Sequence, residues 1–263
     1  MTEAQKMMHI LVSPGEVGRY VFLPGHVGRA TLIAEHFDNP VKLAHHREHL
    51  TYVGELDGEK VAVTSTGIGG PSAGIAVEEL YQCGADTMMR VGSCVSTAPH
   101  VGVGHVIIPK GAVRMEGTGG HYLPIEFPAV PDYESFKALK RAAEESGYPF
   151  DTGITITRDS FYTAAAQQTN PMYPELSWKW EAYEKGGATT SDMESSLLFL
   201  VAASLDIRMS SVMICAADYN EYSNDISDYP SDMEHRAIEV AIAAMRKIIK
   251  KDRSAQEGKY DGK

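Results

Sequence analysis

Three residues that suit the binding of an oxyanion stand close together in the middle of the chain: Arg90, Gly92 and Ser93. An arginine offers a permanently charged, two-pronged donor to phosphate or carboxylate oxygens. A serine hydroxyl adds a further donor, and a glycine lets a ligand approach the backbone closely. These residue types at this spacing therefore point to chemistry on a phosphate or another oxyanion.

The segments around these residues have the pattern of a βαβ unit. Residues 61–66 and 87–91 are short runs that predict buried strands. Between them, three glycines are followed by Pro71, which suits a first helical position, and by a mixed apolar and polar helical surface. Ligands of open α/β sheets bind at the carboxyl ends of strands, so the unit places the oxyanion site at such an end.

Further elements are expected on both sides of this unit. The patterns predict helices at 28–36, 132–147 and 233–250, and strands at 19–23, 43–56, 104–113, 154–157 and 208–217. A turn is expected at Asp57-Gly58, and Ser191 or Asp192 is expected to cap another helix. With no linker in 263 residues, we expect one α/β domain over 1–250 and a polar, disordered tail over 251–263.

Composition excludes several classes of function. The formal net charge of −11 argues against a nucleic-acid or anionic-membrane partner, since both require a basic surface. No apolar run approaches the ~20 residues that span a bilayer, and the N-terminus lacks the order of a secretion signal, so we expect a cytoplasmic protein. Cys83, Cys94 and Cys215 have no metal-ligand or disulfide spacing and are expected to be reduced.

Ordered blocks along almost the whole chain resemble the nucleoside phosphorylase superfamily, and most closely its uridine phosphorylase branch. The blocks are PGHVGRA at 24–30, HHRE at 45–48, STGIGGPS at 65–72, RVGS at 90–93, VRMEGT at 113–118, IEFPAV at 125–130 and SDMESS at 191–196. The resemblance implies a single α/β domain whose mixed central sheet, partly closed like a barrel, is flanked by helices.

The resemblance also implies a reaction and its partners. Inorganic phosphate would cleave the N-glycosidic bond of a nucleoside to give the free base and ribose 1-phosphate, with no redox or organic cofactor. A homodimer, assembled three times into a homohexamer, is implied as well. Arg90, Glu194 and Asp218 become the candidate catalytic residues.

The phosphate site implied by the resemblance consists of Gly25, Arg29, Arg90 and Ser93, together with Arg47 from a neighbouring subunit. A helix that begins near Gly28 would add free backbone N–H groups to it. Taken singly, an arginine such as Arg29, Arg47 or Arg90 is more often part of a surface ion pair than of a binding site. The chain departs from the family at His26-Val27, where relatives usually have Asp-Pro, so the loop after Gly25 is expected to differ.

The ribose site implied by the resemblance consists of Met193, Glu194 and a neighbour's His9, and Phe161 would stack on sugar or base. A glutamate in a first helical turn is ordinarily a surface residue that complements the helix dipole. Three further positions, Glu48, Ile68 and Ser72, match a monovalent-cation site between subunits, which implies a structural K⁺ or Na⁺ there.

The base site leaves two alternatives. Uridine phosphorylases hold uracil with a glutamine and an arginine beyond the phenylalanine, whereas this chain has Gln167 and Gln168 there and no arginine. Asp218, after the last strand, instead resembles the purine-cleaving branch, where it would act as an acid toward the leaving base. We rank uridine first and a purine nucleoside second. A nucleosidase that uses water in place of phosphate is a further alternative.

Overall fold

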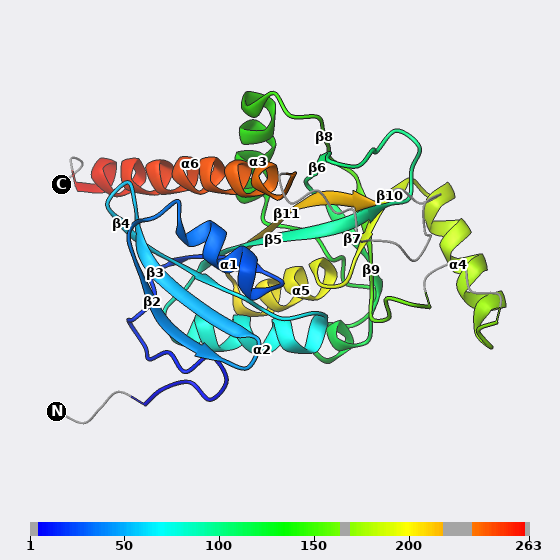
Figure 1. The fold of residues 1–263 in the computed structure, drawn as a ribbon, viewed down its shortest axis with the longest axis horizontal. Helices are drawn as coiled ribbons and strands as arrows, with labels where there is room; N and C mark the ends of the chain where they lie inside the picture. The colour runs from blue at the N-terminus through cyan, green and yellow to red at the C-terminus, as the bar shows by residue number, and fades with distance from the viewer. Residues whose placement is uncertain (1–4, 164–168, 218–232, 261–263) are drawn as a thin grey trace.

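Residues 5–163, 169–217 and 233–260 are described by a computed structural model of the protein. Eleven strands of these residues form one mixed sheet with helices on both of its faces (Figure 1). The strands are β1 (Tyr20–Pro24), β2 (Asp38–His46), β3 (His49–Leu56), β4 (Glu59–Thr64), β5 (Thr87–Ser96), β6 (Val106–Ile107), β7 (Gly111–Met115), β8 (Phe150–Asp151), β9 (Ile154–Arg158), β10 (Ala188–Asp192) and β11 (Arg208–Ala217). The helices are α1 (Val27–Ala34), α2 (Gly70–Gln82), the 3₁₀ helix η1 (Thr118–His121), α3 (Tyr133–Ser146), α4 (Tyr173–Lys185), α5 (Ser195–Leu205) and α6 (Glu234–Tyr260).

Strand β5 is the centre of the sheet. It pairs in parallel with β1 and with β11, and its last residues pair in antiparallel with β10. The main path of the sheet runs β2-β3-β4-β1-β5-β10-β9-β7, and β11, β6 and β8 branch from β5. Among the described residues the path ends at β2 and β7 without closing, so the mixed α/β sheet is confirmed but the expected partial closure is not found.

Two apolar cores lie on the opposite faces of the sheet. Successive side chains of a strand point to opposite faces. In β1, Tyr20 and Phe22 therefore pack in the core under α1, α3 and α6, whereas Val21 and Leu23 pack in the core under α2 and α5. All four side chains are buried. Burying a large apolar side chain stabilises a fold by about 1.5–3 kcal/mol. This alternation holds the central strands, and the residues at their carboxyl ends, in a rigid frame.

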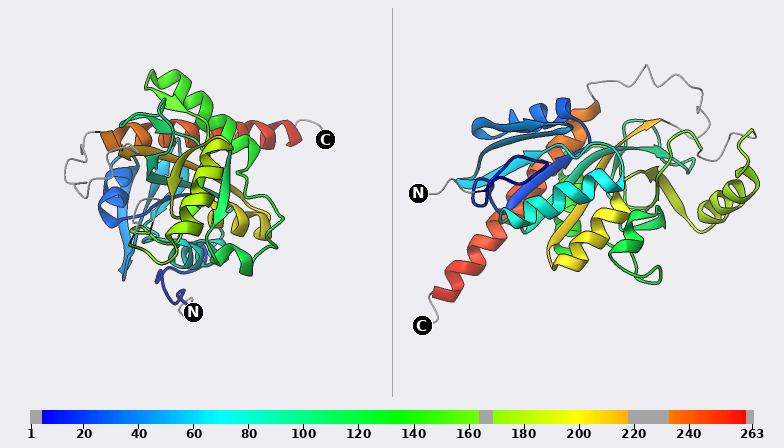
Figure 2. Two further views of the ribbon diagram at one scale, coloured as in Figure 1. Left: turned by 90° about the vertical axis from the view of Figure 1, so that its right-hand side faces the viewer. Right: turned by 90° about the horizontal axis from the view of Figure 1, so that it is seen from below.

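Helix α6 extends further than its pattern predicted. We expected it to end at Lys250 and to be followed by a disordered tail, but it continues to Tyr260. Asp252 explains part of the difference, because its carboxylate accepts hydrogen bonds from the Tyr20 hydroxyl (2.9 Å) and from Nη1 of Arg208 (3.0 Å). The end of α6 and helix α4 project from opposite ends of the molecule (Figures 1 and 2). No helix of the described residues is both long and apolar enough to cross a membrane.

The remaining elements agree with their sequence patterns to different degrees. The expected strand at 43–56 is the hairpin of β2 and β3, which turns at Arg47 with a φ of 53°. Helix α3 agrees closely with its pattern, since Asp132 caps its N-terminus and left-handed Gly147 follows its end. Helix α4 and strand β10 were not expected. The short strand β10 carries Ser191 and Asp192, so α5 begins later, at Ser195.

Candidate active site

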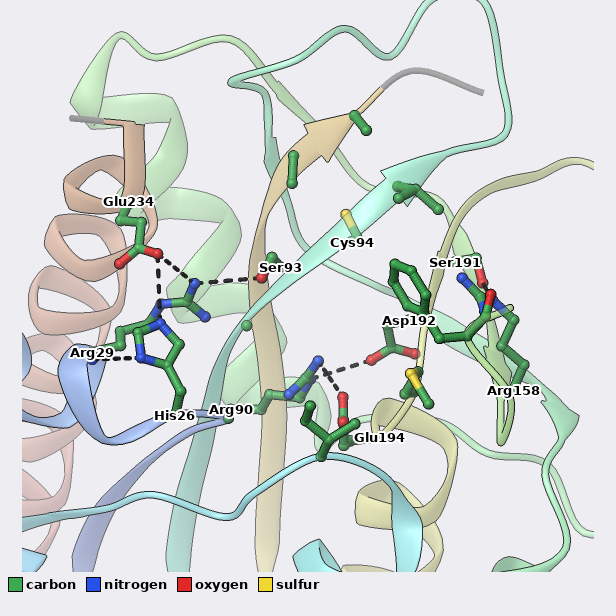
Figure 3. A pocket seen from close by; sticks show the side chains of 18 residues that line it. His26, Arg29, Arg90, Ser93, Cys94, Arg158, Ser191, Asp192, Glu194 and Glu234 are labelled. Atoms are coloured by element: carbon green, nitrogen blue, oxygen red, sulfur yellow. Dashed lines mark hydrogen bonds and ion pairs between the residues drawn. The ribbon is translucent and has the colours of Figure 1, made fainter. Parts of the chain in front are cut away.

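A cavity of about 370 Å³ opens at the carboxyl ends of β1, β5, β9, β10 and β11 (Figure 3). Its lining comprises Gly25, His26, Arg29, Ile68, Arg90, Gly92, Ser93, Cys94, Val95, Arg158, Phe161, Ser191, Asp192, Met193, Glu194, Ala216, Ala217 and Glu234. The strand pattern predicts an oxyanion site at this edge of the sheet, and Arg90, Gly92 and Ser93 lie in the cavity wall.

Arg90 is buried between two carboxylates (Figure 3). Its Nε lies 3.2 Å from Oδ2 of Asp192, and its Nη2 lies 2.6 Å from Oε2 of Glu194. Burial disfavours the charge, but the two carboxylates outweigh it and raise the pKa of Arg90. Gly92 allows this arrangement, since a Cβ at that position would lie 2.6 Å from Cζ of Arg90. The glycine therefore makes room for the guanidinium itself.

The two carboxylates around Arg90 are held by the chain on their other sides. Oε1 of Glu194 accepts a hydrogen bond of 2.6 Å from the backbone N–H of Gly69. Asp192 accepts from the Thr157 hydroxyl at 2.7 Å and from the Ser195 N–H at 2.9 Å. The N-cap of α5 is Glu194 and not Ser191 or Asp192 as expected, so Asp192 holds the first N–H of α5 from outside the cap position. Burial raises the pKa of Glu194, against the opposing effect of Arg90. The site thus presents an oriented carboxylate next to a cation.

Arg29 occupies the other end of the cavity. Its Nη1 donates to the carbonyl of Val91 at 3.1 Å, and its Nη2 donates to Ser93 Oγ at 3.4 Å and to Oε1 of Glu234 at 3.0 Å. Because Val91 and Ser93 belong to β5, the guanidinium is fixed against the central strand. The guanidiniums of Arg29 and Arg90 and the Ser93 hydroxyl thus line one cavity, together with His26, the N-cap residue of α1.

The His26-Val27 loop has its own hydrogen-bonding arrangement. His26 is the N-cap of α1, where its Nδ1 accepts from the backbone N–H of Arg29 at 3.2 Å. Its Nε2 lies 3.6 Å from Oε1 of Glu234. Burial opposes ionisation of Glu234, but the nearby His26 ring and the hydrogen bond from Arg29 prevail and lower its pKa to about 2. The histidine thus replaces the capping that the aspartate of the family pattern would supply.

Arg158 lies on the side of the cavity away from Arg29 (Figure 3), and Phe161 belongs to the same lining. Nε of Arg158 donates to Ser191 Oγ at 3.0 Å, and Nη1 donates to the carbonyl of Phe161 at 2.9 Å. The guanidinium also lies over the Phe161 ring, with Cζ 5.5 Å from its centroid. An aromatic face at this end suits the stacking of a flat ring.

Comparison with known proteins agrees with this geometry. The family model described as the phosphorylase superfamily matches residues 19–251. A uridine phosphorylase from Treponema pallidum (strain Nichols) is 39% identical over 93% of this chain and 95% of its own. The uridine phosphorylase of Escherichia coli (strain K12) is 35% identical over 78% of this chain and 83% of its own.

The chain belongs to the phosphorylase superfamily. The expectation drawn from the sequence blocks is therefore confirmed at the level of the family. A guanosine phosphorylase from Halorubrum lacusprofundi is also similar, with 30% identity over 91% of this chain and 98% of its own. The relatives of this superfamily member thus include proteins named for a pyrimidine nucleoside and for a purine nucleoside.

Most of the site residues that the phosphorylase resemblance implied lie together in the cavity. These are Gly25, Arg29, Ile68, Arg90, Ser93, Phe161, Met193 and Glu194. His9 lies elsewhere, with its Nδ1 2.7 Å from Oε1 of Glu79. Arg47 is exposed at the tip of the β2-β3 hairpin. Gln167, Gln168 and Asp218 lie outside the described residues.

Of the three residues implied for a cation site, Glu48 and Ser72 are in contact, and Ile68 is largely exposed. The Ser72 hydroxyl donates to Oε1 of Glu48 at 2.7 Å and lowers the pKa of that exposed carboxyl. The side chain of Ile68 is 76% exposed. Two oxygen-bearing side chains of a kind that binds alkali cations therefore lie together, and occupancy by K⁺ or Na⁺ stays a prediction.

Several residues that line the cavity were not among the predicted site residues, and His26, Arg158 and Glu234 are three of them. Arg158 ends strand β9, so the argument applied to Arg90, a cation at the carboxyl end of a buried strand, could have found it. His26 was noticed only as a departure from the family pattern. Glu234 had no signal, because an acidic residue at the start of a helix is ordinary.

Proposed function

We propose that this protein is a nucleoside phosphorylase, a pentosyltransferase that moves the ribosyl group of uridine onto inorganic phosphate. The arrangement around Arg90 carries the proposal. On one side lie Arg29 and Ser93, which suit an oxyanion, and on the other lies the oriented carboxylate of Glu194, which suits the hydroxyls of a sugar. A site that binds an anion beside a polyol is what phosphate-dependent cleavage of a nucleoside requires.

In the proposed reaction a phosphate oxygen forms a bond to the anomeric carbon while the bond from that carbon to the base nitrogen breaks. The products are ribose 1-phosphate and the base. Gly25, Arg29, Arg90 and Ser93 hold the phosphate, and Glu194 accepts hydrogen bonds from the ribose hydroxyls. Holding both reactants in place can lower the activation barrier of such a reaction by about 7–11 kcal/mol. Met193 packs against the sugar, and Phe161 stacks on the sugar or base.

The site is proposed to be completed by a second copy of the chain. Arg47 is exposed on its hairpin, and we propose that it reaches the phosphate of a neighbour, as His9 reaches the neighbour's ribose. The unit is a homodimer, and three dimers form a homohexamer with K⁺ or Na⁺ held by Glu48, Ile68 and Ser72. The enzyme acts in nucleoside salvage in the cytoplasm.

Release of base from uridine, measured with and without inorganic phosphate, tests the proposal. We expect uracil and ribose 1-phosphate in equal amounts, and only when phosphate is present. Equal release of uracil without phosphate would instead identify a nucleosidase. Arsenate serves as a positive control, because it can replace phosphate as the attacking oxyanion.

A purine nucleoside is the second candidate substrate, and the similarity to a guanosine phosphorylase favours it. Values of kcat/KM for uridine, thymidine, inosine, guanosine and adenosine decide between the two. We expect uridine to be preferred and Asp218→Asn to leave that preference unchanged. A preference for inosine or guanosine that collapses in Asp218→Asn would assign the purine activity, with Asp218 as its acid. The same kcat/KM values measured for Gln167→Ala and Gln168→Ala show which glutamine contacts the base.

A further inference from the structure

The carboxylate of Glu234, the first residue of α6, lies at the phosphate end of the cavity. Its side chain is only 11% exposed. Its Oε1 lies 3.0 Å from Nη2 of Arg29 and 3.6 Å from Nε2 of His26 (Figure 3). Because Nδ1 of His26 accepts a hydrogen bond from the Arg29 N–H, the proton of a neutral ring is on Nε2, toward Glu234. Glu234 is thus an ionised carboxylate held at an oxyanion site.

A carboxylate at this position weakens the binding of an anion that carries no proton. The described lining contains three guanidiniums, those of Arg29, Arg90 and Arg158, and three carboxylates, those of Asp192, Glu194 and Glu234. Asp192 and Glu194 are paired with Arg90, whereas Glu234 is paired with Arg29. An incoming anion that binds Arg29 therefore meets a like charge at short range, which is unfavourable.

The repulsion becomes an attraction when the anion carries a proton. An ionised carboxylate can only accept hydrogen bonds, and it has about four lone-pair positions for them. Oε1 of Glu234 accepts a hydrogen bond from Arg29 and faces Nε2 of His26 at 3.6 Å, and Oε2 has no hydrogen bond to any of the described residues. The hydroxyl of a hydrogen phosphate ion can donate to this carboxylate, whereas sulfate at the same pH has no proton to donate.

We propose that Glu234 makes the anion site selective for protonated tetrahedral oxyanions, phosphate and arsenate, against sulfate. The carboxylate accepts a hydrogen bond from the P–OH group while Arg29 and Ser93 donate to the unprotonated oxygens. His26 positions the carboxylate through its Nε2. The inference rests on the proposed function, in which inorganic phosphate is the second substrate, and it adds the basis on which that substrate is chosen.

Titration calorimetry of the free protein with inorganic phosphate and with sodium sulfate tests the inference. The buffer is mildly alkaline and of fixed ionic strength, so that both anions are divalent and only phosphate carries a proton. We expect the wild type to prefer phosphate. The preference is the dissociation constant of sulfate divided by that of phosphate. In Glu234→Gln, whose amide can donate to sulfate, this ratio should fall by about ten- to a hundredfold. Glu234→Ala, the second variant, should also lower the ratio.

Glu239→Gln is the matched control, because it removes an exposed carboxylate from the same helix, where Glu239 accepts from the Tyr148 hydroxyl. It should keep the wild-type ratio. An unchanged ratio in both Glu234 variants, or an equal gain in affinity for both anions, would overturn the inference. The binding measurement needs no turnover. Selectivity without nucleoside cleavage would overturn only the proposed function, and phosphorolysis with an unchanged ratio would overturn only the inference.

Discussion

At the scale of single residues, the guanidinium of Arg90 has both a structural and a functional role. It holds the buried carboxylates of Asp192 and Glu194, and it faces the cavity beside Ser93. Because both carboxylates are buried, the charge of Arg90 cannot be removed without leaving them uncompensated. A substitution at Arg90 therefore affects both stability and activity.

We expect Arg90→Ala to lower kcat/KM by about ten- to a hundredfold, since a charge-assisted contact is worth about 1.5–3 kcal/mol. It should also destabilise the fold by roughly 3–5 kcal/mol, because Asp192 and Glu194 lose their common partner. Steady-state kinetics on protein shown to be folded, together with urea unfolding, measure the two effects separately. Arg19→Ala removes an exposed ion pair with Asp86 and serves as the control. An unchanged KM for phosphate in Arg90→Ala would contradict its assigned role.

The ion pair of Glu234 predicts a pH dependence of stability. Its pKa is lowered in the folded state from 4.5 to about 2, so the folded state binds this proton less readily than the unfolded state. The stabilisation is therefore complete above about pH 4.5 and is lost as the pH falls toward 2. The difference in unfolding free energy between the wild type and Glu234→Gln should shrink through this window. A difference that stays constant through the window would show that Glu234 has no lowered pKa.

At the scale of elements, strand β5 and the loops around it position the chemistry. The strand supplies Arg90 and Ser93 from its own residues and fixes Arg29 of α1 through the carbonyl of Val91. The glycine-rich turn before α2 contributes the N–H of Gly69, which orients Glu194 of the segment before α5. One strand thus links the anion-binding side of the cavity to the side that suits a sugar.

Gly92→Ala tests the close contact within β5. The added Cβ would lie 2.6 Å from Cζ and from Nη2 of Arg90, so the guanidinium must move away from its two carboxylates. We expect a loss of about 1–3 kcal/mol in stability and at least about tenfold in kcat/KM. Gly120→Ala is the control, because a Cβ there meets nothing within 4 Å. Wild-type kinetics in Gly92→Ala would show that Arg90 does not need this position.

At the scale of the whole molecule, the described chain brings together only part of the site that the family resemblance implied. Arg47 and His9 lie outside the cavity, on the hairpin of β2 and β3 and on the segment before β1. Both are on the periphery, where a second copy of the chain could be reached. If two copies share the site as proposed, activity is a property of the assembly.

Hybrids of two inactive variants test the shared site. Arg47→Ala and Glu194→Gln subunits should each have low activity alone. Mixed in equal amounts and allowed to exchange, they should recover about one quarter of the wild-type activity, since half of the random dimers are hybrids with one intact site of two. Native mass spectrometry confirms that hybrids form. Hybrids without recovered activity, or an active monomer in light scattering, would contradict the proposed dimer.

The sequence by itself determined that Arg90, Gly92 and Ser93 lie toward the carboxyl end of a buried strand, β5. Strand period, the glycines before α2 and the position of Arg90, Gly92 and Ser93 are local patterns, and local patterns predict which edge of a sheet a side chain reaches. Helices α3 and α6 were found for the same reason, by an apolar face at helical spacing. The resemblance to the family then added Arg29 and Glu194, which lie far from Arg90 in the sequence.

Only the tertiary structure decided which charges face each other. The contact of Arg29 with Glu234 joins residues 205 positions apart, and it depends on how α6 packs across the sheet. An apolar face shows that a helix packs, but it does not specify which polar residue at its end meets which partner. The same holds for Arg158 on Phe161 and for the position of Arg90 between its two carboxylates. The polar lining of the cavity is thus set by the packing of distant elements, whereas its location at the strand ends is set by local sequence.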